Sequence, residues 1–155
     1  MGHTFSSVAR KCAASAIIIA LSTSTALAME SGQTARGGAF VSGGIGAGEI
    51  AALDAQRGKY SLWLITAAKT SGAYLADVRI RITDEKKATV LQTTMAGPWL
   101  LVDLPVGRYE VEASYRGQTF DRPTTIHAGD HHQMVFYFDV AADVLPKDAA
   151  EAARK

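Results

Sequence analysis

LPVGRYEV, at residues 104–111, is the stretch that decides the fold class. Pro105 fixes φ and lacks an N–H donor, and Gly107 permits positive φ, so the stretch begins as a tight turn. From Tyr109 onward, apolar and polar residues alternate up to Tyr115. This alternation is typical of a strand with one buried and one solvent-facing side. We expect the ring of Tyr109 to lie in the core with its hydroxyl bonded to the backbone, as in the tyrosine corner of immunoglobulin-like sandwiches.

Six further segments carry strand signals and are separated by turn residues. Together with residues 108–115, we expect strands at residues 60–68, 74–83, 89–95, 99–104, 118–126 and 131–140. Pro123 cannot donate a hydrogen bond to a ladder, so its strand is expected to lie at a sheet edge or to contain a bulge. Short strands with turn signals about 8–12 residues apart, and no long helical pattern, predict one all-β domain over residues 59–140. The architecture is a sandwich or a barrel, of which we favour the sandwich.

Residues 1–28 have the pattern of a secretory signal peptide. Arg10 and Lys11 precede an apolar run at residues 13–21, and Ala26-Leu27-Ala28 offers a cleavage site of small residues. A transmembrane span is the alternative, but it needs roughly 20 consecutive apolar residues, and the run is shorter. The segment therefore predicts export to the periplasm or beyond the cell, with no stable membrane anchor after cleavage.

Charge and cysteine content of the processed chain exclude several classes of protein. The chain has 16 basic and 15 acidic residues, and residues 1–28 hold two of the basic ones and no acid, which leaves 14 and 15, a net charge of −1. A nearly neutral chain gives no support for nucleic-acid binding. Cys12 is the single cysteine and lies in the predicted signal peptide, so no disulfide is expected.

The segments on either side of the predicted domain have different compositions. Residues 29–58 begin with a stretch rich in Gly, Ser, Ala and Thr, which offers little apolar surface to offset the entropy cost of ordering. We predict a flexible leader there, with a short helix near residues 49–57. Residues 44–48 resemble a phosphate-binding glycine loop only weakly, because the glycine spacing and the following βαβ unit are missing. Residues 141–155 are predicted to form a charged tail, with a short helix near residues 146–154.

Several residues of the predicted domain resemble the carboxypeptidase regulatory-like domain, a group of transthyretin-like (prealbumin-like) β-sandwiches. The residues that carry the resemblance are Asp77, Val78, Ile80, Ile82, Asp84, Thr93, Gly97, Leu104, Pro105, Gly107, Tyr109, Val111, Gly117 and Gly129. The match covers roughly residues 60–140, and the segments at residues 72–77 and 97–101 resemble a bacterial subgroup of exported proteins. The resemblance implies a seven-stranded Greek-key sandwich with an accessory, non-catalytic role. A zinc-protease motif is missing from the chain, so the resemblance does not imply peptidase activity.

Two sets of residues are candidates for binding. His127, His131 and His132, with Asp130, are the one group with metal-ligand character, but adjacent strand residues point to opposite faces, which argues against a shared metal. Tyr74, Trp99 and Leu101 would form an aromatic patch if all three were exposed.

Neither a catalytic residue nor a cofactor site is predicted, since no serine lies in a nucleophile-elbow context and the acids are scattered. The leading hypothesis is an exported, non-enzymatic accessory or binding module of the cell envelope, with an unidentified envelope protein or a glycan as its partner. One alternative is a carbohydrate- or peptide-binding module that uses the aromatic patch. The other is a metal-binding envelope protein that uses the three histidines.

Overall fold

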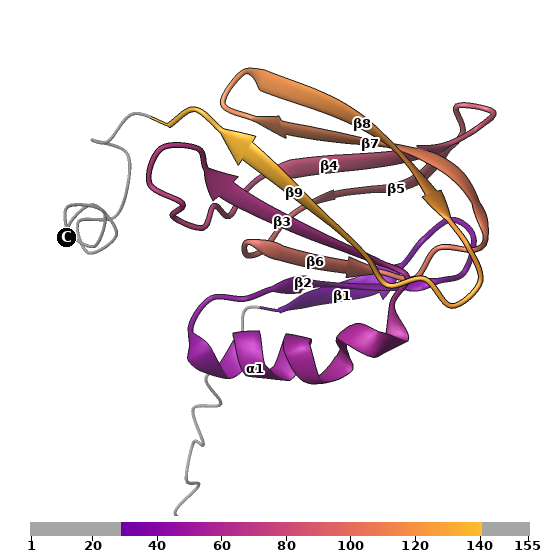
Figure 1. The fold of residues 1–155 in the computed structure, drawn as a ribbon, viewed down its shortest axis with the longest axis horizontal. Helices are drawn as coiled ribbons and strands as arrows, with labels where there is room; N and C mark the ends of the chain where they lie inside the picture. The colour runs from indigo at the N-terminus through magenta and orange to yellow at the C-terminus, as the bar shows by residue number, and fades with distance from the viewer. Residues whose placement is uncertain (1–28, 141–155) are drawn as a thin grey trace, which may run out of the picture.

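The computed structural model describes residues 29–140 and shows two β-sheets packed face to face, with one helix on the outside (Figure 1). In chain order the elements are β1 (Glu30–Gln33), β2 (Ala39–Gly43), α1 (Ala47–Gln56), the 3₁₀ helix η1 (Arg57–Lys59), β3 (Leu62–Ala68), β4 (Arg79–Asp84), β5 (Thr89–Thr94), β6 (Trp99–Val102), β7 (Gly107–Tyr115), β8 (Gln118–Ile126) and β9 (His132–Phe138). The all-β sandwich is confirmed. The expected number of seven strands is wrong, because β1 and β2 precede the seven that lie between residues 60 and 140. The strand expected at residues 74–83 is also shorter than predicted, since β4 begins at Arg79.

The strands divide into two sheets of different size. Sheet A has the order β1-β2-β6-β3-β9, and sheet B has the order β5-β4-β7-β8. The pairs are antiparallel except β3 with β9, which run parallel. The edge position expected for the strand with Pro123 is confirmed, because β8 is the last strand of sheet B.

The main core lies between the two sheets and follows from the alternation seen in the sequence. On β4, Ile80 and Ile82 are fully buried, whereas Arg79 and Arg81, which alternate with them, are exposed. The buried residues that meet between the sheets include Leu62, Leu64, Ile80, Ile82, Leu100, Val102, Val111, Phe136 and Phe138. Full burial of one such side chain stabilises the fold by about 1.5–3 kcal/mol.

The segment at residues 104–109 bends at Val106 and leads directly into β7. Tyr109 is 4% exposed, and its hydroxyl donates a hydrogen bond of 2.8 Å to the carbonyl oxygen of Pro105. The prediction of a buried tyrosine bonded to the backbone is therefore confirmed. This contact ties the start of β7 to the turn that precedes it.

The flexible leader predicted for residues 29–58 is wrong, because these residues complete sheet A. β1 and β2 form a hairpin, and β2 pairs with β6 in a register that places Phe40 opposite Val102. Phe40 packs in the core between the sheets, and Val41 packs on the other side of the strand. Two of the glycines lie at close backbone contacts: a Cβ added to Gly38 would lie 1.9 Å from the carbonyl oxygen of Asp103, and a Cβ added to Gly97 would lie 2.2 Å from the carbonyl oxygen of Gly43.

The helix expected near residues 49–57 is present as α1 and packs against the outer face of sheet A (Figure 1). Leu53 is fully buried there, and Ile50 is half-buried, but Ala51 is exposed. The second core cluster under the helix consists of Val41, Leu53, Ile65, Trp99 and Leu101. Trp63 packs against this cluster with its ring centroid 4.7 Å from that of Trp99.

The predicted signal peptide (residues 1–28) and the charged tail with its helix (residues 141–155) lie outside the described residues. Within residues 29–140, no helix has the length and the apolar character needed to cross a membrane.

Candidate binding site

An apolar cleft of about 490 Å³ lies at the end of the sandwich where β3, β7 and β9 finish, the left end in Figure 1. We call it the end cleft. Its lining residues are Gly44, Ile45, Gly46, Ile50, Tyr74, Leu75, Ala76, Asp77, Pro98, Tyr115 and Val140. The volume lies within the range of about 300–1,000 Å³ that is common for small-ligand sites.

The first wall of the end cleft is the loop between β2 and α1. Gly44 and Gly46 have φ angles of 97° and 83°, a backbone conformation that residues with a side chain rarely adopt. The buried carboxylate of Glu49 accepts hydrogen bonds from the backbone N–H groups of Gly44 and Ile45, each at 3.0 Å. These bonds hold the loop so that Ile45 is left 54% exposed. A bound phosphate would need the same N–H groups, but these are already bonded to an acidic side chain. The weak resemblance to a phosphate-binding loop is therefore not matched by the geometry of this loop.

The second wall is the connection between β3 and β4, which contains Tyr74 and Asp77. Leu75 is fixed to Thr66 by two hydrogen bonds: its N–H donates to the Thr66 carbonyl at 3.0 Å, and the Thr66 hydroxyl donates to the Leu75 carbonyl at 2.6 Å. Tyr74 forms an isolated bridge with Ala67 and remains 54% exposed. The backbone of this wall is therefore held firmly while an aromatic ring is presented to solvent.

Asp77 is the single charged residue among those that line the end cleft. It has a φ angle of 59°, and its N–H donates to the Met95 carbonyl at 2.9 Å. Among residues 29–140, its carboxylate takes part in no ion pair. The guanidinium of Arg116 lies 5.4 Å from the ring centroid of Tyr115, which is one of the lining residues. The end cleft is thus apolar with one acidic group at its margin.

The aromatic patch predicted from Tyr74, Trp99 and Leu101 is wrong as a set. Tyr74 is exposed in the end cleft, but Trp99 is 7% exposed and Leu101 is fully buried. The two buried residues are covered by α1, whose docking could not be read from the strand pattern of residues 99–104. Ile45 and Val140 were not identified as site residues from the sequence. The signal for Ile45 is an isolated apolar side chain between glycines, and the signal for Val140 is an apolar side chain at a strand end.

The histidine group is brought together only in part. His127 and Asp130 interact through Nδ1 and Oδ2 at 3.0 Å, and His131 Nδ1 lies 2.9 Å from the Tyr60 carbonyl oxygen. The backbone N–H and the imidazole of His127 lower the pKa of the Asp130 carboxyl. In the part of the chain that the structure describes, no group of three or more potential metal ligands is gathered, so His127, His131 and His132 do not form a shared site.

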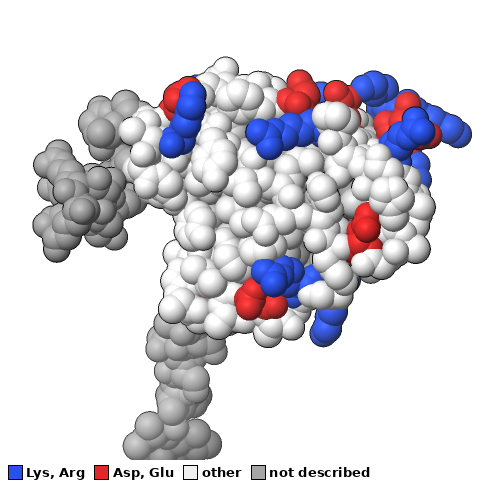
Figure 2. Space-filling model, viewed as in Figure 1, with Lys and Arg blue, Asp and Glu red and all other residues white. Residues whose placement is uncertain are grey.

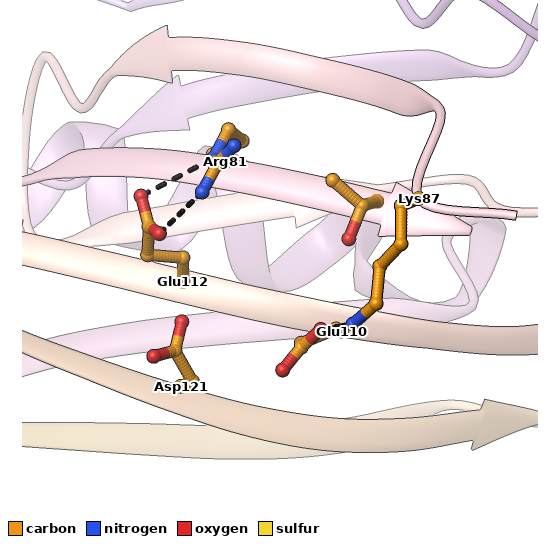
Figure 3. A pocket seen from close by; sticks show the side chains of 6 residues that line it. Arg81, Lys87, Glu110, Glu112 and Asp121 are labelled. Carbon is orange, nitrogen blue, oxygen red and sulfur yellow. Dashed lines mark hydrogen bonds and ion pairs between the residues drawn. The ribbon is translucent and has the colours of Figure 1, made fainter. Parts of the chain in front are cut away.

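The outer face of sheet B is polar and lies away from the end cleft. Figure 2 shows charged side chains along this side of the molecule, and Figure 3 shows side chains that line a hollow on the sheet. The volume of this hollow is about 260 Å³. Arg81 and Glu112 are register partners and form two hydrogen bonds, of 3.2 and 2.5 Å. Lys87 pairs with Glu110. Because these charges neutralise one another, the face is suited to solubility and strand register rather than to ligand binding.

Comparisons with protein-family models give no match for this chain, and a search of curated proteins also gives none. Functional inference therefore depends on the geometry of the end cleft and on the sequence.

Proposed function

We propose that this protein is an exported, non-enzymatic β-sandwich of the transthyretin-like, Greek-key type, which acts as a binding module in the cell envelope. The residues that resemble the carboxypeptidase regulatory-like domain support the fold type, as do the connections β3–β4 and β6–β7, which pass from sheet A to sheet B. Export is supported by the signal-peptide pattern. Cleavage after Ala28 would leave both sheets complete, because β1 begins at Glu30.

The observation that carries the binding role is the end cleft, where Tyr74 and Ile45 are each 54% exposed beside apolar walls. Large apolar side chains that stay exposed around a concave surface are typical of interaction sites. Recognition of a neutral glycan needs several hydrogen-bonding groups beside an aromatic ring, and the lining is mainly apolar. The ligand that fits best is therefore a side chain of an extended peptide segment of a partner protein.

The binding role is tested by titrating the purified, isotope-labelled protein with blocked pentapeptides that differ in the central residue, followed by NMR. We expect shift changes for residues of the end cleft and weaker binding by Tyr74→Ala. Tyr137→Ala is the matched control, because Tyr137 is 51% exposed but does not line the cleft. Equal loss in both variants, or binding of oligosaccharides in place of peptides, would contradict the proposal.

Export is tested separately by cell fractionation and N-terminal sequencing of the full chain expressed in a Gram-negative host. We expect a processed product in the periplasm or medium that begins at Met29. A cytoplasmic product that keeps Met1 would contradict export.

A further inference from the structure

We propose that the group bound in the end cleft is a lysine side chain of the partner peptide. This inference rests on the proposed binding role and names the chemistry that the site recognises. The cleft offers three features that together match a lysine: an apolar wall for the stem, a carboxylate for the ammonium group, and aromatic rings that line the same cleft.

The carboxylate of Asp77 supplies the charge complementarity. It is the single charged residue that lines the cleft, and no lysine or arginine among residues 29–140 forms an ion pair with it. Its positive φ of 59° is uncommon for a residue with a side chain, and the hydrogen bond from its N–H to Met95 holds it there. A residue kept in a sparsely populated conformation beside a cleft is a frequent feature of binding sites.

Tyr74 and Tyr115 supply aromatic rings to the same cleft. The face of an aromatic ring attracts a cation within about 6 Å of its centroid. The Tyr115 ring has such a contact within the chain, since the guanidinium of Arg116 lies 5.4 Å from its centroid. The ring of Tyr74 is 54% exposed and has no such cation among the described residues, so it is available to an incoming ammonium group.

The apolar walls select a long, unbranched stem. Ile45, Pro98 and Leu75 line the cleft, and a lysine buries its methylene chain along apolar surface while its charged end stays near water. The lysine ammonium group is a compact point charge on a flexible four-carbon stem, so the single carboxylate of Asp77 can receive it while the stem follows the apolar wall. An acidic side chain is disfavoured, because it would meet the carboxylate of Asp77 with no described cation lining the site.

The test compares three blocked pentapeptides with central lysine, norleucine or glutamate, titrated into the purified protein by NMR. Norleucine keeps the stem of lysine but lacks the ammonium group. We expect the lysine peptide to bind about fivefold more tightly than the norleucine peptide. This difference corresponds to the contribution of an exposed ion pair together with a cation–π contact. We expect the glutamate peptide to bind most weakly.

Asp77→Asn should remove the preference for lysine over norleucine. Asparagine tolerates positive φ, so the fold should be kept, which an unchanged Tm checks. Asp121→Asn is the matched control, because Asp121 is an exposed acid on the outer face of sheet B, and it should keep the preference. On the unchanged protein, raising the salt concentration should weaken binding of the lysine peptide more than that of the norleucine peptide; this second measurement remains decisive if Asp77→Asn does not fold.

The outcomes separate the two proposals. Equal affinity for lysine and norleucine peptides at the end cleft would overturn the lysine inference and leave the binding role in place. Failure of every peptide to bind would overturn both.

Discussion

Truncation of Leu53 tests whether α1 is an integral part of the fold. Leu53 is fully buried between α1 and the outer face of sheet A. Leu53→Ala removes three carbon atoms from the core, at about 0.8 kcal/mol each, and leaves a cavity that adds a further cost. We expect the free energy of unfolding to fall by about 3 kcal/mol, a large share of the roughly 5–15 kcal/mol typical of a domain. The corresponding fall in Tm is about 12 °C for a domain of this size.

Tryptophan fluorescence during urea denaturation is the most direct assay. Trp63 and Trp99 are the two tryptophans of the chain, and both lie in or against the cluster that Leu53 completes. Ile45→Ala is the matched control, because Ile45 is 54% exposed and its truncation should cost less than about 0.5 kcal/mol. A loss below about 1 kcal/mol for Leu53→Ala would refute the docking of α1.

Three further substitutions test individual contacts. Tyr109→Phe removes the hydroxyl bonded to the turn backbone and should lower the free energy of unfolding by about 0.5–1.5 kcal/mol in urea denaturation; an unchanged value would contradict the tyrosine corner. Gly97→Ala places a methyl group against the backbone of Gly43 and should cost about 1–3 kcal/mol, whereas Gly58→Ala, with open space around it, should be nearly neutral; equal Tm values for the two variants would count against the close approach. Backbone N–H groups of its own hairpin, followed by the ion pair with an arginine, lower the pKa of Asp84, so its stabilising contribution is complete above the ordinary pKa and is lost as the pH falls through the lowered value. Asp84→Asn should therefore flatten the acid limb of a plot of unfolding free energy against pH, and an unchanged limb would show that the carboxylate is not responsible.

The strands of residues 60–140 could be predicted well because each is bounded by turn residues and carries either an alternation, as in β4 and β7, or a short apolar run, as in β3 and β6. The tight turn with Pro105 and Gly107 feeds a strand whose inward side, including Tyr109 and Val111, is buried as the pattern indicates. Local physical chemistry was sufficient there, since turn geometry and binary pattern point to the same structure.

Residues 29–58 were predicted poorly because their structure depends on partners far along the chain. β2 has only a short apolar stretch, and it is stable because it pairs with β6 at Trp99–Val102. The composition of the segment predicted disorder. In the fold, the absence of a side chain at Gly97 lets its backbone pack closely against that of Gly43. Trp99 is buried because α1 covers it, a contact that the strand pattern of residues 99–104 does not reveal. The end cleft could not be predicted because its lining comes from parts of the chain that are far apart in sequence: the loop after β2, the β3–β4 connection, the end of β7 and the residues after β9.

Hydrogen exchange of the β2 amides tests most directly the central claim that the N-terminal segment completes sheet A and forms a wall of the end cleft. We expect amides of Phe40–Gly43 with ladder hydrogen bonds to β1 or β6 to be protected to the same degree as ladder amides of β6. Exchange of the β2 amides at the rate of an unfolded chain, while β6 stays protected, would contradict it.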